Sequence, residues 1–134
     1  MQRVGFLRED LRCAEDFEWW LRWALAARCG FLDRTVEKRR MHDSNIIHDR
    51  RLRLESHLAV LTYLAAPESG LNRTQRLALD SAIHRQRYRL ASEWFVAANY
   101  SASLCQLRQT NPRHLHALDR LKWVAKMVLS FARS

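Results

Sequence analysis

Residues that interrupt helices are rare along this chain. Its 134 residues include three glycines and two prolines, the two residue types that most disfavour a helix interior. Apolar residues make up 48% of the chain and charged residues 28%, a balance typical of a folded globular protein rather than a disordered one. The sequence therefore predicts a mainly α-helical protein with long helices.

Apolar residues recur at three- and four-residue spacing in several segments, which is the pattern of amphipathic helices. Gly30 and the turn-forming run 67–70 supply stop signals between them. Asn111 and Pro112 predict a helix start, because Asn can cap free N–H groups and Pro at the first helical position loses no hydrogen bond. The predicted helices cover residues 15–28, 47–64 and about 72–98, then a shorter segment that ends at 110 and a last segment that begins at 111.

Residues 31–40 read differently, because their partial alternation of apolar and polar side chains predicts a short strand, followed by a loop over 41–45. We therefore expect a mainly α protein with one or two short strands in this region. Short connections between the later helices indicate antiparallel neighbours in a bundle or a stack of hairpins.

Charge divides the chain into two unlike parts. The net charge is +9, of which residues 1–48 carry +1 and residues 49–134 carry +8. We expect two domains with this boundary, the second a basic α-helical tail that attracts anionic partners.

Two anionic partners fit the basic tail, a membrane surface and a nucleic acid. The last helix carries apolar residues on more than one face, which fits either burial in a bundle or attachment at a membrane surface. Net charge is the one feature that favours nucleic acid, since no helix-turn-helix, zinc-finger or RNA-binding strand motif is present in the sequence. We therefore expect peripheral contact with an anionic membrane rather than binding to nucleic acid.

The expected compartment is the cytoplasm, with peripheral contact at the inner face of the membrane. The longest stretch without a charged residue, Trp94 to Leu107, is shorter than the roughly 20 apolar residues of a membrane-spanning helix. The N-terminus reaches Glu9 and Asp10 before any apolar run, unlike a secretory signal. Three widely spaced cysteines favour free thiols in a reducing compartment.

The densest group of chemically capable residues opens the first predicted helix. Glu15 and Asp16 are adjacent carboxylates beside large aromatic side chains, an arrangement that can place a general base beside a flat substrate. Acidic residues also favour the first turn of helices in general, so spacing alone leaves a purely structural role open.

The same segment resembles a known family. Residues 5–22 read G-F-L-R-E-D-L-R-C-A-E-D-F-E-W-W-L-R, similar to the acceptor-side segment G-x-F-D-E-x-L-R-x-x-E-D-x-D-L-W-L-R of family 2 glycosyltransferases. Residues 30–33 and 39–45 resemble that family's closing strand and its Y-R-x-H-x-x-N segment. The likeness covers about residues 4–47. The chain departs from the family pattern at Arg8, Glu18, Trp19 and Arg40.

The resemblance implies an inverting transfer of a sugar from a nucleotide-sugar donor to a glycan or lipid-linked acceptor. Residues 1–48 would then be the C-terminal fragment of an α/β GT-A domain, with the helical tail following it. The resemblance makes Asp16 the base that deprotonates the acceptor hydroxyl, Glu15 its positioning partner and Trp20 part of the acceptor platform. It also implies substrate contacts from Arg39 and Asn45, and contact of His42 with the donor's divalent metal, Mg²⁺ or Mn²⁺.

The nucleotide-binding half and the D-x-D metal motif of that family are expected elsewhere, because no D-x-D occurs in the 134 residues. We therefore expect the chain to be incomplete as an enzyme by itself and to bind no metal alone: a fragment, the product of a late start codon, or a decayed copy. His114 and His116 form an H-x-H pair, but with no third ligand nearby in sequence a metal site is not expected there.

Overall fold

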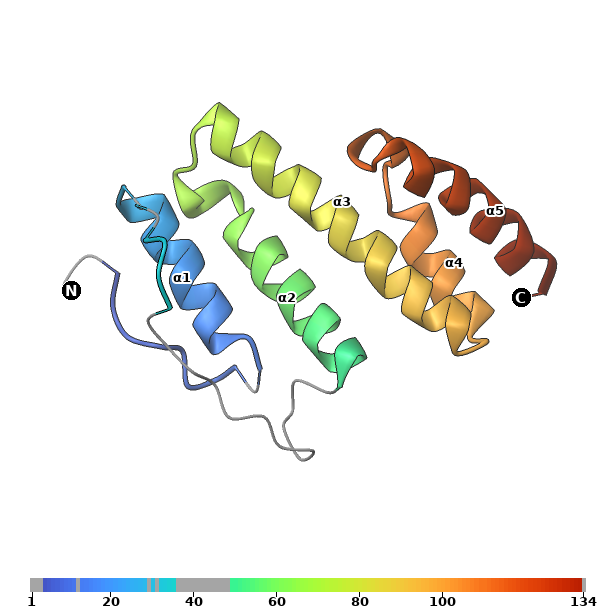
Figure 1. The fold of residues 1–134 in the computed structure, drawn as a ribbon, viewed down its shortest axis with the longest axis horizontal. Helices are drawn as coiled ribbons and strands as arrows, with labels where there is room; N and C mark the ends of the chain where they lie inside the picture. Colours follow the sequence, from blue (N-terminus) through green and yellow to red (C-terminus); the bar gives the residue numbers. More distant parts are fainter. Residues whose placement is uncertain (1–3, 12, 29, 31, 36–48, 134) are drawn as a thin grey trace.

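The structure is a computed structural model that describes residues 4–11, 13–28, 30, 32–35 and 49–133. All regular secondary structure in these residues is helical (Figure 1). The α-helices are α1 (Glu15–Ala26), α2 (Arg50–Leu64), α3 (Arg73–Val96), α4 (Tyr100–Arg108) and α5 (Ala117–Arg133), and two short 3₁₀ helices are η2 (Pro67–Ser69) and η3 (Pro112–His114).

The strand predicted within residues 31–40 is wrong where the structure describes it. Residues 32–35 form no strand, and the Arg34 N–H donates to the Leu32 carbonyl over 2.9 Å in a tight turn. A strand needs a neighbour to complete its hydrogen bonds, and the described residues contain no other strand. Residues 31 and 36–48 lie outside the described part. The expected α/β GT-A fragment is therefore corrected to an all-helical fold, whereas the mainly α character is confirmed.

Side-chain caps fix where most of the helices begin. Asp49 accepts a hydrogen bond from the Leu52 N–H at the start of α2. Asn72 and Gln75 form a reciprocal capping box at the start of α3, with hydrogen bonds of 2.9 and 3.0 Å. Asn99 accepts from Ala102 N–H at the start of α4 and Asn111 from Arg113 N–H at η3.

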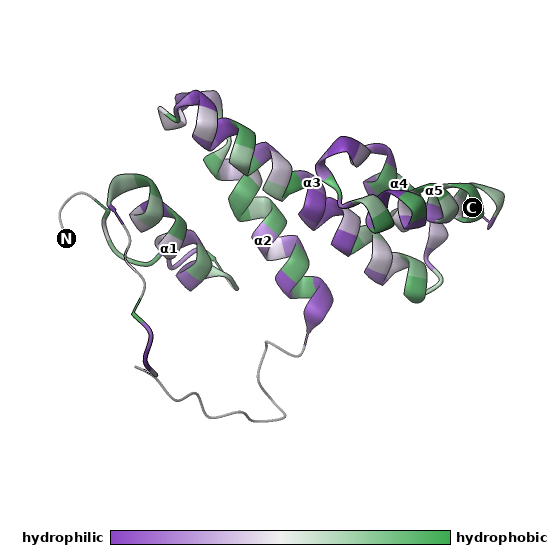
Figure 2. Ribbon diagram, turned by 45° about the horizontal axis from the view of Figure 1, so that its top comes forward, coloured by the Kyte–Doolittle hydropathy of each residue, from purple (hydrophilic) through white to green (hydrophobic). Residues whose placement is uncertain are grey.

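The helices form two successive hairpins. The first hairpin consists of α2, η2 and α3, and the second of α4, η3 and α5; α3 lies between α2 and the second hairpin (Figure 1). In Figure 2, hydrophobic and hydrophilic residues alternate along α2 and α3, as expected for helices that are buried along part of their circumference. Helix α1 packs on the first hairpin.

Two apolar cores share α3. Leu79 and Ile83 in its first half join Val60, Leu61 and other residues of the core under α1. Tyr88 and Ala91, farther along the same helix, join the second core, which contains Leu107 and Leu115 and is flanked by Trp123 and Met127. The apolar spacing predicts five inward positions on this helix, and Leu79, Ile83 and Leu90 are buried as predicted. Trp94 is half-buried, and the prediction is wrong at Ala97, which is exposed.

The last helix begins later than predicted. Asn111 and Pro112 start the 3₁₀ helix η3, and α5 itself begins at Ala117. One of the apolar faces of α5 is exposed, with Leu118 at 72%, Leu121 at 71% and Val128 at 62% of full exposure. The opposite face packs inward, where Trp123 and Met127 lie against the second core.

Candidate functional site

The predicted base stands at the first turn of α1. Asp16 is exposed, and its Oδ1 accepts a hydrogen bond from the Phe17 backbone N–H over 2.7 Å. Glu15 precedes it and is half-buried. Three acidic residues fall in this turn, where the positive end of the helix dipole interacts favourably with carboxylates. The backbone contact fixes one oxygen of Asp16 on an accessible helix end.

An exposed indole lies one helical turn beyond this carboxylate. Trp20 is 64% exposed and follows Asp16 by four residues, so the two side chains share a face of α1. Its ring meets the ring of Trp19 edge to face, with centroids 5.3 Å apart, and Trp19 meets Trp23 in the same way at 5.8 Å. These contacts support Trp20 from one side and leave the rest of its surface accessible.

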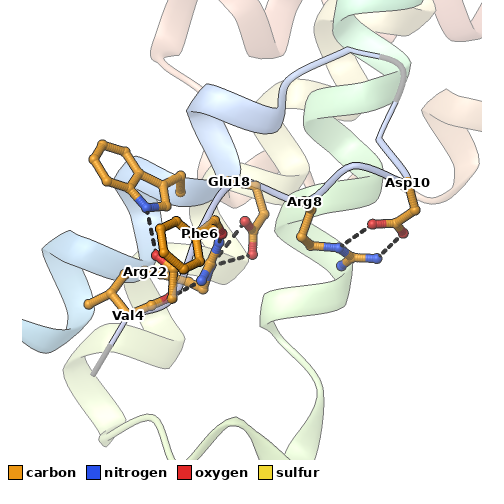
Figure 3. Close-up of polar contacts among 8 residues, drawn as sticks. Val4, Phe6, Arg8, Asp10, Glu18 and Arg22 are labelled. Atoms are coloured by element: carbon orange, nitrogen blue, oxygen red, sulfur yellow. Dashed lines mark hydrogen bonds and ion pairs between the residues drawn. The ribbon is translucent and has the colours of Figure 1, made fainter. Parts of the chain in front are cut away.

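A buried ion pair ties the preceding loop to α1. Glu18 is 1% exposed, and its carboxylate receives Nε of Arg22 at 2.8 Å. The same guanidinium donates to the carbonyl of Val4 and, over 2.7 Å, to the carbonyl of Phe6 (Figure 3). Arg22 therefore satisfies a buried carboxylate and holds the backbone of the loop that leads to the acidic turn.

The loop is shaped to receive this guanidinium. Gly5 has φ +72°, a conformation that residues with a side chain rarely adopt, and its carbonyl accepts a hydrogen bond from Trp19 Nε1 over 3.1 Å. A side chain at Gly5 would place its first carbon 3.4 Å from Nη1 of Arg22. The positive φ and the close approach of Arg22 therefore explain why position 5, where the segment that resembles the family begins, is a glycine.

A second, exposed ion pair lies farther along the loop. Arg8 donates from Nε to Asp10 over 3.0 Å, and its guanidinium stands 4.7 Å from the ring centre of Tyr63 on α2. Hydrogen bonding to Arg8 holds the pKa of Asp10 below its usual range. Arg8, which departs from the family pattern, thus connects the loop to the first hairpin.

His57 of α2 is a titratable neighbour that the sequence did not single out. Its ring stacks on Phe17 with centroids 4.1 Å apart and planes 17° apart. Burial and the nearby charge of Arg53 lower the pKa of His57, while Asp16 acts on it in the opposite direction. An imidazole therefore lies close enough to Asp16 for their charges to interact.

The structure brings together half of the predicted site residues. Glu15, Asp16 and Trp20 lie on α1, within two turns of each other. Arg39, His42 and Asn45 fall within residues 36–48 and so lie outside the described part.

Among the described residues, no group of three side chains gathers the all-oxygen ligands that Mg²⁺ or Mn²⁺ prefers. In the part of the chain that the structure describes, one group of three side chains can hold a metal ion, and it consists of Asp80, His84 and His114. These residues belong to α3 and η3 rather than to α1. Two imidazoles and one carboxylate are not the donor-metal ligands that the resemblance implies. Sequence spacing held one signal for this group, since Asp80 and His84 are four residues apart on a predicted helix.

A basic cleft lies between α3 and α5. Its volume is about 320 Å³, and Lys126 reaches across it to Ser92 over 2.6 Å. Burial, followed by the nearby charge of Lys122, lowers the pKa of Lys126. Asp119 is the acidic residue among those that line the cleft. The basic residues that line the cleft are Arg50, Arg85, Arg89, His116, Lys122 and Lys126.

No helix in the described ranges combines the length and the apolar character that crossing a membrane requires. Comparison of the chain with family models, with curated proteins and with solved structures gives no match in any of the three.

Proposed function

We propose that this chain supplies the acceptor-side base of an inverting sugar transfer. The observation that carries the proposal is the joint exposure of Asp16 and Trp20 on one face of α1, one turn apart. A sugar ring can stack on the indole while its hydroxyl approaches the carboxylate. Nothing in the described fold blocks this face, because both side chains are open to solvent.

The proposed step needs a carboxylate that is accessible and fixed. As the acceptor oxygen attacks the anomeric carbon of the donor, Asp16 takes the hydroxyl proton and the nucleotide diphosphate leaves. The Phe17 N–H orients one oxygen of the carboxylate by hydrogen bonding. Glu15 lies beside Asp16 and contributes to its position.

The buried pair beneath this face supports the geometry. Arg22 and Glu18 hold the loop and the first two turns of α1 in one arrangement. A fixed scaffold is what a catalytic carboxylate requires, because a displacement of about 1 Å can cost a large part of the rate. The donor site, with its Mg²⁺ or Mn²⁺ and the contacts of Arg39, His42 and Asn45, remains an expectation from the resemblance.

An assay of sugar transfer, carried out with the longest polypeptide that the gene encodes, tests this function. Nucleotide-sugar donors are offered with glycan and lipid-linked acceptors, and wild type is compared with Asp16→Asn. Loss of a general base typically costs about 10²–10⁴-fold in rate, and donor binding should stay nearly unchanged. Asp10→Asn is the matched control, because Asp10 is an exposed carboxylate of the same loop that pairs with Arg8. Full turnover by Asp16→Asn would remove Asp16 from the role of base.

A second candidate function, contact with an anionic membrane, is favoured by the surface of α5. Leu118, Leu121 and Val128 are exposed on this helix, and Lys122 and Lys126 line the basic cleft beside α3. A helix that presents apolar residues next to cations can lie in the interface of a bilayer that carries acidic lipids. The cations and the anionic lipid are complementary in charge.

Flotation with vesicles tests the second function. We expect binding to vesicles with acidic lipid, weaker binding as salt is raised, and loss of binding in Leu118→Ser combined with Lys122→Gln. Leu77→Ser combined with Arg34→Gln removes one exposed leucine and one exposed basic residue outside α5 and serves as the control. Equal binding to neutral vesicles would count against an electrostatic anchor.

A further inference from the structure

Two imidazoles and a carboxylate meet where α3 passes the turn before α5. His84 Nε2 lies 3.5 Å from Asp80 Oδ1, and His114 Nε2 lies 3.3 Å from Asp80 Oδ2. The two rings are stacked, with centroids 4.7 Å apart. Residues separated by 30 positions in the chain therefore direct three ligand atoms to one place, all within 4.8 Å of one another.

The spacing of these atoms fits a small tetrahedral cation. Ligands bound to zinc at about 2.0–2.1 Å stand about 3.3–3.4 Å apart along a tetrahedral edge. The two contacts with Asp80 are 3.3 and 3.5 Å and use different oxygens, so binding one cation requires a rotation of the carboxylate and of the stacked rings that brings one oxygen and both Nε2 atoms together. Asp80 is 52% exposed, which leaves the carboxylate open to an ion arriving from solvent.

Outer contacts orient the ring of His114. Its Nδ1 lies 2.8 Å from Ser81 Oγ, and a proton on Nδ1 donated to that hydroxyl leaves Nε2 as a lone pair directed at the cluster. Metal-binding histidines commonly donate their other N–H to an oxygen in this way. The Ser81 hydroxyl can therefore accept the Nδ1 proton in the tautomer that a metal ligand needs.

His84 has two backbone neighbours that allow either tautomer. Its Nδ1 accepts from the Asn111 N–H over 3.2 Å, which places the ring proton on Nε2. The carbonyl of Gln109 also interacts with this ring and favours a proton on it. Cation binding at Nε2 would move the ring proton to Nδ1 and would break the hydrogen bond from the Asn111 N–H.

We propose that Asp80, His84 and His114 form a binding site for a divalent cation of the zinc class, with water at the remaining position. Imidazole nitrogens with one carboxylate oxygen suit Zn²⁺, Co²⁺ or Ni²⁺ better than Mg²⁺ or Ca²⁺. The bound ion would join the middle of α3 to η3, and so would fix the turn of the second hairpin against the helix that both cores share. This site is separate from the proposed acceptor site on α1 and does not depend on it.

Cobalt absorption tests the site directly. Co²⁺ is titrated into the metal-free full chain, and we expect one equivalent to give the intense visible bands of a tetrahedral ion, which Zn²⁺ then displaces. Asp80→Asn and His114→Gln should each weaken binding at least about tenfold. His116→Gln is the matched control, because His116 is an exposed histidine two residues from His114 and lies outside the cluster. Circular dichroism confirms that each variant is folded.

Thermal unfolding provides a second readout. Zn²⁺ at about a hundredfold excess over its dissociation constant should raise the Tm by about 10 °C, and Mg²⁺ should have no effect. Absence of a saturable Co²⁺ signal, unchanged affinity in a folded Asp80→Asn variant, or equal loss in His116→Gln would each overturn the proposal. In those cases the cluster is a hydrogen-bonded carboxylate with two imidazoles and no metal site.

Discussion

The two hairpins have similar turns, but within the described residues another helix covers the outer surface of the first and none covers that of the second. In the first, Arg76 in the first turns of α3 donates to the carbonyls of Leu71 and Pro67 over 3.1 and 3.0 Å. In the second, Arg120 occupies the equivalent position of α5 and donates to the carbonyls of Leu115 and Arg113, both over 3.0 Å. In both hairpins, Nε of the arginine donates to the carbonyl of the residue five positions earlier. One local device thus builds both turns.

The surroundings of the two hairpins differ. Leu61 and Leu64 of the first are buried where Phe17 and Leu21 of α1 pack against the core. The corresponding outer surface of the second is the exposed apolar face of α5. A shared arginine contact in the turn therefore does not decide whether the outer face of a hairpin is buried, because that burial depends on another segment.

The largest expected effect concerns α1, the helix that covers the first hairpin. Arg22→Met leaves the buried carboxylate of Glu18 without its partner, and breaking such a pair typically costs about 3–5 kcal/mol. Urea unfolding followed by circular dichroism measures the loss. Arg8→Met removes an exposed pair and should lower the free energy of unfolding far less than Arg22→Met does. Equal effects of the two changes would mean that α1 is not held by Arg22.

Truncation of one buried and one exposed leucine compares the inner and outer faces of the second hairpin. Leu107 is fully buried, and Leu107→Ala should cost about 2–5 kcal/mol of unfolding free energy. Leu118→Ala, on the exposed face of α5, should stay within about 0.5 kcal/mol. Thermal and urea unfolding measure both. A large cost at Leu118 would show that this face is covered in solution, for example by a second copy.

The paired turn arginines give a smaller effect. Arg76→Met and Arg120→Met each remove two charge-assisted hydrogen bonds to backbone carbonyls, and each should cost about 1–3 kcal/mol. Similar costs would sharpen the equivalence of the two turns. A cost confined to Arg76 would break it and would indicate that the second turn is held mainly by the contacts of η3.

The smallest expected effect is the pH dependence of stability that comes from the contact of His57 with α1. The pKa of His57 lies below its ordinary value of 6.5, mainly because of burial. The native state therefore binds a proton less readily than the unfolded state, and stability present above about pH 6.5 falls as the pH drops through the native pKa. Urea unfolding between pH 7.5 and 5.5 with a metal chelator should show this decline, and His57→Gln should show a shallower one. An unchanged slope in the variant would contradict the assignment.

The helices were predictable because their signals are local. Spacing of apolar residues, the Asn72 cap and the Asn111–Pro112 pair each act within a few residues, and the structure places helix boundaries close to them. The strand prediction was wrong because strand formation depends on a partner strand, which can lie far away in the sequence. The sequence could not show which face of α5 packs inward for a related reason: two of its faces are apolar, and only the position of the second core decides between them.

The two candidate sites differ in the same respect. Glu15, Asp16 and Trp20 lie on one short helix, so a sequence motif could nominate them together. The contact of His57 with α1, and the meeting of His84 with His114, join residues that are far apart in the chain. Only packing of the helices brings those rings together, so periodicity and motif spacing could not reveal them.

The sharing of α3 by both cores constrains the chain in a way that its composition hides. Each residue added to a helix turns everything beyond it by about 100°. A single insertion between Ile83 and Tyr88 would therefore turn the second core, together with α4 and α5, around the axis of α3 relative to the first core, even if every side chain were kept. Evolution can exchange the amino acids along this stretch, but it cannot freely change how many there are.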